Sequence, residues 1–193
     1  MVNKTIVVAS NNKHKIQEIG EILSDFHIKK ASDVVDSFDV EEDGESFCEN
    51  AYLKAKSLSK YTNDMVLADD SGLEVFALNN EPGIFSSRYS KEQTDEANVK
   101  KLLKNMEGIK DRSARFVCCM VLIINDTIIQ KEGYVYGTIT DKPVGDSGFG
   151  YDPIFIPNGY DRTFAEMDSN LKNKLSHRRA AIEMIKKSLE ELV

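Results

Sequence analysis

Apolar and polar positions along this 193-residue chain follow two periods, one typical of strands and one typical of helices. Short apolar runs bounded by polar residues predict strands, and apolar residues spaced three or four apart predict helices with one buried face. The predicted strands cover residues 5–9, 65–68, 73–77, 114–124 and 128–136, and a hairpin at residues 125–127 joins the last two. Because strands and helices alternate, we expect an α/β fold, a mixed, twisted sheet flanked by helices.

Capping residues place the starts of the predicted helices. Ser46, followed three residues later by Glu49, is a capping box that opens a helix over residues 46–61. Thr94 caps a helix that ends near residue 105. The first and last helices cover residues 13–23 and residues from 176 on, with apolar faces formed by Ile16, Ile19, Ile22 and Leu23 and by Ala180, Ile182, Ile185 and Leu189.

Length and composition predict the type of protein. We expect one domain over residues 1–193, built as two lobes around a central cleft, since there is no internal repeat, low-complexity tract or linker. A net charge of -7 argues against a general nucleic-acid-binding surface, although a small anion needs only a local positive pocket. The longest apolar run, residues 116–124, is far below the roughly 20 residues that span a bilayer. Residues 1–9 are too few for a signal peptide, so we expect a cytoplasmic protein without membrane partners.

The three cysteines are odd in number, and two of them are adjacent on an apolar run: Cys48, Cys118 and Cys119. This arrangement offers neither a disulfide framework nor a Cys-x-x-Cys metal pattern. We therefore expect buried, reduced thiols.

The first candidate site directly follows the strand at residues 5–9. It consists of six consecutive polar residues, Ser10, Asn11, Asn12, Lys13, His14 and Lys15. Backbone amides and a lysine meet here at the start of a helix, where phosphate is favoured. Cations in a first helical turn oppose the helix dipole, which indicates a nearby anion; solvated surface charges are the alternative. The common phosphate loops, Gly-x-x-x-x-Gly-Lys-Ser/Thr and Gly-x-Gly-x-x-Gly, are excluded by pattern.

Two carboxylates, Asp69 and Asp70, end the predicted strand at residues 65–68 and precede Ser71 and Gly72. Oxygen ligands of this kind suit a hard cation such as Mg²⁺. Adjacent strand residues point to opposite faces, so we expect one aspartate to be a metal ligand or base and the other to be structural. The alternative is a purely structural Asp-Asp-Ser-Gly turn.

A second acidic cluster precedes the helix that Ser46 caps. Its members are Glu41, Glu42, Asp43 and Glu45. Acids near a helix N-terminus in a solvated loop are the alternative to a ligand role.

The third candidate site is a loop that contains Phe149, Gly150, Tyr151 and Asp152. Two rings and a carboxylate could stack on a base and bind its edge, and a structural turn is the alternative. Cationic and donor groups follow near the last helix start, at Lys172, His177 and Arg178. Such groups could donate to the carbonyl-rich edge of a purine.

Taken together and in order, these segments resemble the inosine triphosphate pyrophosphatase family, also called XTP/dITP diphosphatases. The resemblance spans nearly the whole chain and is carried by Ser10-x-Asn12-x-x-Lys15, Asp69-Asp70-Ser71-Gly72-Leu73, Pro82-Gly83-Ile84-Phe85-Ser86-Ser87-Arg88-Tyr89, Gly148-Phe149-Gly150-Tyr151-Asp152-Pro153-Ile154-Phe155 and Ser176-His177-Arg178.

The resemblance implies a homodimeric, Mg²⁺-dependent hydrolase that binds a nucleoside triphosphate in its cleft. It would cleave ITP, dITP and XTP between the α- and β-phosphates and so remove deaminated purines from the nucleotide pool. The implied roles are triphosphate binding for Ser10, Asn11, Asn12, Lys13, His14 and Lys15; catalysis for Asp70; metal binding for Glu41 and Asp70, with Glu42 as the alternative to Glu41; and substrate binding for Ser71, Phe149, Gly150, Tyr151, Asp152, Lys172, His177 and Arg178.

Two other functions are compatible with the same residues. One is a pyrophosphatase of related architecture that acts on other modified nucleotides. The other is a nucleotide-binding protein without catalysis, against which the intact acidic pair argues.

Overall fold

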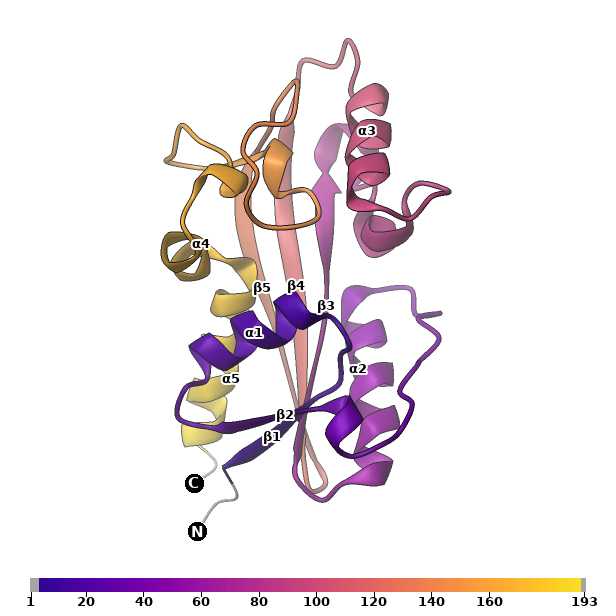
Figure 1. The fold of residues 1–193 in the computed structure, drawn as a ribbon, viewed down its shortest axis with the longest axis vertical. Helices are drawn as coiled ribbons and strands as arrows, with labels where there is room; N and C mark the ends of the chain where they lie inside the picture. Colours follow the sequence, from indigo (N-terminus) through magenta and orange to yellow (C-terminus); the bar gives the residue numbers. More distant parts are fainter. Residues whose placement is uncertain (1–3, 192–193) are drawn as a thin grey trace. The chain divides into compact units, whose positions relative to one another are not determined.

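The computed structural model, which describes residues 4–191, contains a six-stranded mixed sheet with helices, as the sequence predicts (Figure 1). The strand order is β2-β1-β3-β4-β5-β6. Strand β1 pairs in parallel with β2 and β3, whereas β5 and β6 are antiparallel. The strands are β1 Thr5–Val8, β2 His27–Lys30, β3 Met65–Val75, β4 Ser113–Ile124, β5 Thr127–Ile139 and β6 Phe155–Pro157.

The helices are α1 Lys13–Ile22, α2 Phe47–Leu58, α3 Asp95–Asn105, α4 Ser169–Leu175 and α5 His177–Glu190. Helices α2 and α3 begin where the capping residues Ser46 and Thr94 predict. Ser46 and Thr94 each accept a hydrogen bond from a backbone amide in the first turn of α2 and α3, as predicted. None of the described helices is both long enough and apolar enough to cross a membrane.

The chain divides into two compact units. The first comprises Met1–Asp70, Cys118–Gly133 and Arg178–Val193, and the second Ser71–Val117 and Tyr134–His177. Strand β3 therefore changes unit between Asp70 and Ser71.

The first unit packs helices on both faces of its part of the sheet. Met65 and Leu67 of β3 lie in a core with residues of α1 and α5, whereas Val66 and Ala68 lie in a separate core with residues of α2. This alternation follows from the two-residue period of a strand. The same alternation directs Asp69 of β3 to the face of α1 and α5 and Asp70 to the face of α2.

The second unit has its own apolar core. Residues of β3, β4, α3 and the segment around β6 contribute to it, including the packed rings of Phe116, Phe155 and Phe164. Phe116 and Phe155 have ring centroids 4.7 Å apart in an edge arrangement.

Several element boundaries differ from the prediction. Strand β3 is continuous, so the prediction that Asp69 and Asp70 end a strand before a turn was wrong. The polar run Asp69 to Gly72 interrupts the apolar pattern, yet the strand continues through it, and Asp69 and Asp70 are buried beside charged partners. The elements β2, β6 and α4 were not predicted, because they are short and carry weak apolar patterns.

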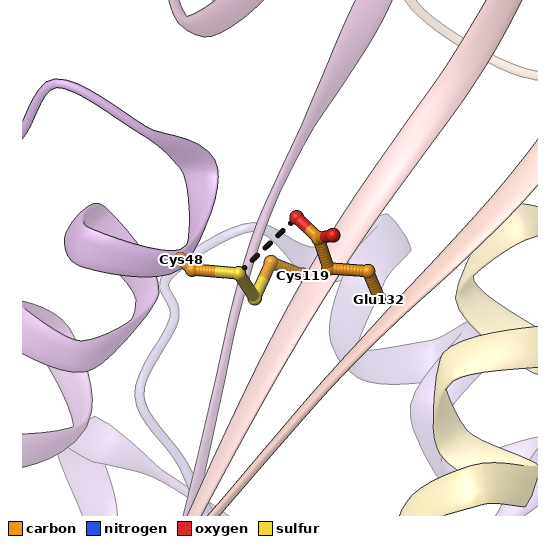
Figure 2. Close-up of side chains that lie close together, drawn as sticks. All are labelled: Cys48, Cys119 and Glu132. Carbon is orange, nitrogen blue, oxygen red and sulfur yellow. Dashed lines mark hydrogen bonds between the residues drawn. A yellow bond between two sulfur atoms is a disulfide. The ribbon is translucent and has the colours of Figure 1, made fainter.

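The expectation of three reduced thiols was also wrong. Cys48 and Cys119, 71 positions apart, form a disulfide, and Cys118 is free and buried (Figure 2). Cys118 lies in the core beside α1 and α5. Adjacent strand residues point to opposite faces, so Cys119 points to the face of α2, where Cys48 lies. An odd number of cysteines excludes a complete pairing but not a single bridge.

Candidate active site

The polar segment after β1 forms the start of α1. The side-chain oxygen of Asn12 accepts hydrogen bonds from the backbone amides of His14 and Lys15, at 3.0 and 3.3 Å. The Asn12 amide donates to Ser10 Oγ at 3.1 Å, and the Asn11 side chain donates to the Phe38 carbonyl at 2.7 Å. These bonds hold an exposed loop in one shape at a helix N-terminus, where partial positive charge favours an anion.

The anion nearest to Lys15 is Asp69. Lys15 Nζ lies 3.1 Å from Asp69 Oδ2, and the same oxygen accepts from Arg178 Nε and Nη2 at 3.3 and 3.2 Å. Arg178 also donates through Nη1 to Glu18 of α1. Arg178, Asp69 and Glu18 are buried and Lys15 is partly buried, so three of the four charged groups have little contact with solvent.

This network controls the charge of Asp69. Burial alone would raise the pKa of Asp69, but Lys15, Arg178 and Lys54 lower it well below its usual range. Asp69 is therefore ionised at neutral pH. The charged carboxylate holds the Lys15 ammonium next to the loop at the start of α1.

Asp70 points to the other face of the sheet and has different partners. Lys54 Nζ lies 3.1 Å from Asp70 Oδ1, and Asn50 Nδ2 donates to Asp70 Oδ2 at 3.3 Å. Both partners come from α2, one turn apart. The prediction that alternation separates the two aspartates is thus confirmed.

Lys54 also joins Asp70 to the acidic loop before α2. Its ammonium contacts Glu42 Oε1 at 3.1 Å, the same distance as to Asp70. Asn50 fixes this loop as well, because its side-chain oxygen accepts from the Gly44 amide at 2.9 Å. Glu41 is exposed.

The balance of charges differs between Asp70 and Asp69. Burial raises the pKa of Asp70, and the lowering effects of Lys54 and Lys15 do not compensate for it; the charge of Glu42 adds to the rise. A carboxyl group with a raised pKa is closer to the proton affinity that a general base needs near neutral pH.

The donor set around Asp70 fits a hard divalent cation. Carboxylate oxygens of Asp70 and Glu42 already converge on one cationic group, the Lys54 ammonium. Mg²⁺ is commonly held by one or two carboxylates together with substrate phosphates, so two carboxylates suffice.

In the second unit, contacts with Asp152 fix the loop of residues 149–152, called here the aromatic loop. Asp152 Oδ2 accepts from the Phe149 amide at 2.8 Å and from Lys172 Nζ at 2.6 Å. The Lys172 ammonium also lies 4.6 Å from the centre of the Phe149 ring. Gly148 has a φ of 80°, and a Cβ there would lie 2.2 Å from Asp152 Oδ2, so only glycine fits.

The remaining predicted residues have structural contacts of their own. The Tyr151 hydroxyl donates to the Ser86 carbonyl at 2.8 Å, and the Gly150 amide donates to Asp95 at 2.7 Å. His177 is buried and stacks on Phe116 with ring centroids 5.0 Å apart.

The structure therefore groups the predicted residues by unit. Lys15 and Arg178 meet at Asp69 in the first unit, whereas Lys172 and the aromatic loop meet at Asp152 in the second. Arg178, predicted to bind the base, donates from its guanidinium to Asp69 and Glu18. Ser71 follows Asp70 in β3 and begins the second unit.

Three polar residues of the site were missed by sequence reasoning: Glu18, Asn50 and Lys54. Each lies on the apolar face of its helix, Glu18 beside Ile19 and Ile22 in α1, and the other two among the buried residues of α2. The available signal was a polar or charged residue on an apolar helix face, because a buried group of this kind requires a partner.

The fold and these clusters define the chain as an α/β protein with two acidic residues held by separate networks in its central sheet. The chain belongs to the Ham1 family, whose model matches residues 6–188. This family membership confirms the resemblance that the motifs carry.

Relatives are similar over nearly their whole length. The chain is 47% identical over 189 residues to a dITP/XTP pyrophosphatase of Staphylococcus aureus strain MW2, covering 97% of each chain. It is 45% identical over 197 residues to the dITP/XTP pyrophosphatase of Clostridium tetani strain Massachusetts / E88, covering 98% of each.

Solved structures of relatives have the same fold. The Staphylococcus aureus Ham1 protein aligns with a TM-score of 0.89 at 45% identity, covering 98% of this chain and 100% of that one. A HAM1 protein from Coxiella burnetii aligns with a TM-score of 0.88 at 42% identity, covering 99% and 100%.

Proposed function

We propose that this protein hydrolyses non-standard purine nucleoside triphosphates, namely ITP, dITP and XTP, to the monophosphate and pyrophosphate. The observation that carries the proposal is Asp70, a buried carboxyl group with a raised pKa that Lys54 and Asn50 hold in place. The dITP/XTP pyrophosphatase relatives support the substrate class and the reaction. The protein would thereby remove deaminated purines from the nucleotide pool.

Asp70 is the proton acceptor of the proposed reaction. It takes a proton from water, and the water oxygen attacks the triphosphate. The bond between the α- and β-phosphates breaks, and pyrophosphate leaves the nucleoside monophosphate. The segment from Ser10 to His14 binds the triphosphate through its backbone amides and its side chains. Lys15 stabilises the charge that develops on the phosphates, and Asp69 keeps its ammonium in place.

Mg²⁺ is the cofactor we propose, held by Asp70 and an acid of the loop before α2. When bound, it neutralises the phosphate charge. Glu41 was predicted as the second ligand, and the shared contact of Glu42 and Asp70 with Lys54 favours Glu42. Glu42→Gln should raise the Mg²⁺ concentration for half-maximal activity more than Glu41→Gln does; the reverse order would assign Glu41.

Base binding is assigned to residues of the second unit, Ser71 among them. Phe149, Gly150, Tyr151 and Asp152 form the loop, and the Phe149 ring offers a surface for stacking. Lys172 and His177 would donate to the oxygen that hypoxanthine and xanthine carry at position 6.

Adenine carries an amino donor at that position, so donors would face a donor and ATP would be rejected. The contacts of Arg178 with Asp69 and Glu18 favour a positioning role over the base contact that was predicted for it.

The proposed form is a single pyrophosphatase domain over residues 1–193, acting as a homodimer in the cytoplasm without nucleic-acid or membrane partners. The net charge of -7 supports a small substrate over a nucleic acid.

The test measures pyrophosphate and orthophosphate release from dITP, XTP, ATP and GTP at equal concentration, with Mg²⁺ and with chelator. Pyrophosphate released only from dITP and XTP, and only with Mg²⁺, is expected. Orthophosphate as the product, or equal turnover of ATP, would refute the proposed reaction. Preference for a modified pyrimidine would indicate a related pyrophosphatase, and bound but unconsumed nucleotide would indicate a binding protein.

A further inference from the structure

The disulfide between Cys48 and Cys119 connects the first turn of α2 to β4. Cys119 is fully buried, whereas Cys48 is half-buried and is the second residue of α2. The two Cα atoms lie 5.1 Å apart, a separation that is common for disulfides. The proposed function uses neither residue.

The two sulfurs are not equally reactive. A thiolate at a helix N-terminus is stabilised by the partial positive charge there, and Cys48 occupies such a position. Cys119 is fully buried, so Cys48 is the less buried residue of the pair. Cys118 is excluded from this chemistry, because burial and the charge of Asp69 raise the pKa of its thiol.

Glu132 of β5 is the third member of this cluster. Its Oε1 lies 3.3 Å from Cys48 Sγ, and Figure 2 shows its carboxylate directed at that sulfur. A disulfide sulfur has no proton to donate, whereas a Cys48 thiol would donate a hydrogen bond to the carboxylate. Glu132 therefore favours the reduced form of the pair.

We propose that Cys48 and Cys119 are a reversible redox site in which Glu132 accepts the proton of the Cys48 thiol. The oxidant is a small-molecule disulfide. The Cys48 thiolate attacks one of its sulfurs and releases one thiol; deprotonated Cys119 then attacks Cys48 Sγ and releases the second thiol. Two protein thiols are oxidised to one disulfide, and one small disulfide is reduced to two thiols.

Oxidation of this site fixes the start of α2. Asn50 lies two residues after Cys48, and it contacts both Asp70 and the Gly44 amide. Lys54 follows one turn later on the same helix. The redox state of the site therefore determines how firmly α2 holds the Asp70 network, whatever reaction Asp70 performs.

The first experiment equilibrates the full-length protein in mixtures of a small thiol and its disulfide at pH 6, where thiols are protonated. Alkylation in denaturant, which exposes the buried Cys118, and mass spectrometry then count the free thiols. We expect three free thiols in the reduced protein and only Cys118 free in the oxidised protein. Failure to form the disulfide, or failure of a large excess of thiol to open it, would refute the redox role.

Glu132→Gln tests the third member of the cluster. The amide is a weaker acceptor, so the equilibrium should shift about tenfold towards the disulfide, or about 30 mV for two electrons. Glu107→Gln, which removes an exposed carboxylate elsewhere, is the control. An equal midpoint for both variants would remove Glu132 from the site.

Zinc provides a further test, because two thiolates and a carboxylate can also bind a metal. Reduced protein incubated with Zn²⁺ and dialysed should retain none and should still form the disulfide. Retention of one equivalent that blocks oxidation would refute the redox role and indicate a metal site.

The second experiment measures hydrogen exchange of the α2 amides, which does not depend on any enzymatic activity. Reduction, or the variant Cys48→Ser, should make these amides exchange about tenfold faster than in the oxidised protein, with a smaller change in α3. Cys118→Ser keeps the pair and should leave α2 protected. Equal protection of α2 in both redox states would show that the disulfide does not hold the helix.

Discussion

Replacing Arg178 by Met tests whether this residue organises buried carboxylates or binds the nucleotide. Arg178 is 1% exposed and makes two hydrogen bonds to Asp69 Oδ2, at 3.3 and 3.2 Å, and a third to Glu18. Met fills a similar volume but removes the charge. Asp69, whose side chain has no exposed surface, then keeps Lys15 as its nearest cation.

Breaking a buried ion pair by removing one partner costs about 3–5 kcal/mol, because the other charge remains buried. In a domain of this length, each kcal/mol lowers Tm by about 2–4 °C, so Arg178→Met should lower it by about 6–20 °C. The control is Arg179→Met, because Arg179 forms an exposed pair with Glu183 at 2.7 Å. That pair contributes only about 0.3–0.5 kcal/mol.

The assay is urea-induced unfolding followed by circular dichroism, with the KM for dITP measured on the same samples at a temperature where both variants are folded. A loss of stability confined to Arg178→Met supports the positioning role. Equal stability of the two variants, together with a raised KM for Arg178→Met, would refute this reasoning and place the guanidinium on the nucleotide, as the sequence motif predicts.

Three further predictions follow from the same contacts. Asp70→Asn should retain the fold and dITP binding but lose turnover, as measured by pyrophosphate release; normal hydrolysis would exclude Asp70 as the essential base. Lys172→Ala should raise the KM for dITP and lower stability by about 1–3 kcal/mol, because Asp152 loses the partner at 2.6 Å; unchanged kinetics would remove Lys172 from the site. The lowered pKa of Asp69 contributes stability that is present above its unfolded pKa of about 4 and is lost as pH falls through the folded value. Asp69→Asn should therefore destabilise the protein strongly at pH 7 and by only about 1 kcal/mol less at pH 3 in urea unfolding, because the folded pKa lies lower still; a loss of most of the destabilisation already at pH 3 would contradict the assigned charge state.

Local patterns predicted the parts of the structure that depend on neighbouring residues. Ser46 and Thr94 cap helices because capping needs only the next three residues. The opposite orientations of Asp69 and Asp70 follow from strand alternation alone. The continuation of β3 through them could not be predicted, because what keeps them in the strand is contact with other parts of the chain.

The partners of these aspartates were hidden for the same reason. Arg178 lies 109 positions from Asp69, and Cys48 lies 71 positions from Cys119. No periodicity connects residues so far apart, and a single sequence contains no record of which pairs meet. The role of Lys54 was hidden differently, since a lysine in a helix is usually solvated.

The division of the chain into interleaved units sets an order for folding during synthesis. The second unit is complete once His177 has been made, whereas the first unit still lacks the segment that begins with Arg178. Domains generally form as soon as their residues emerge from the ribosome. The unit that starts first is therefore finished last, and until then the buried carboxylates of Asp69 and Glu18 have no guanidinium. The segment made last, which begins with Arg178, thus completes the charge balance of α1 and β3, which are made much earlier.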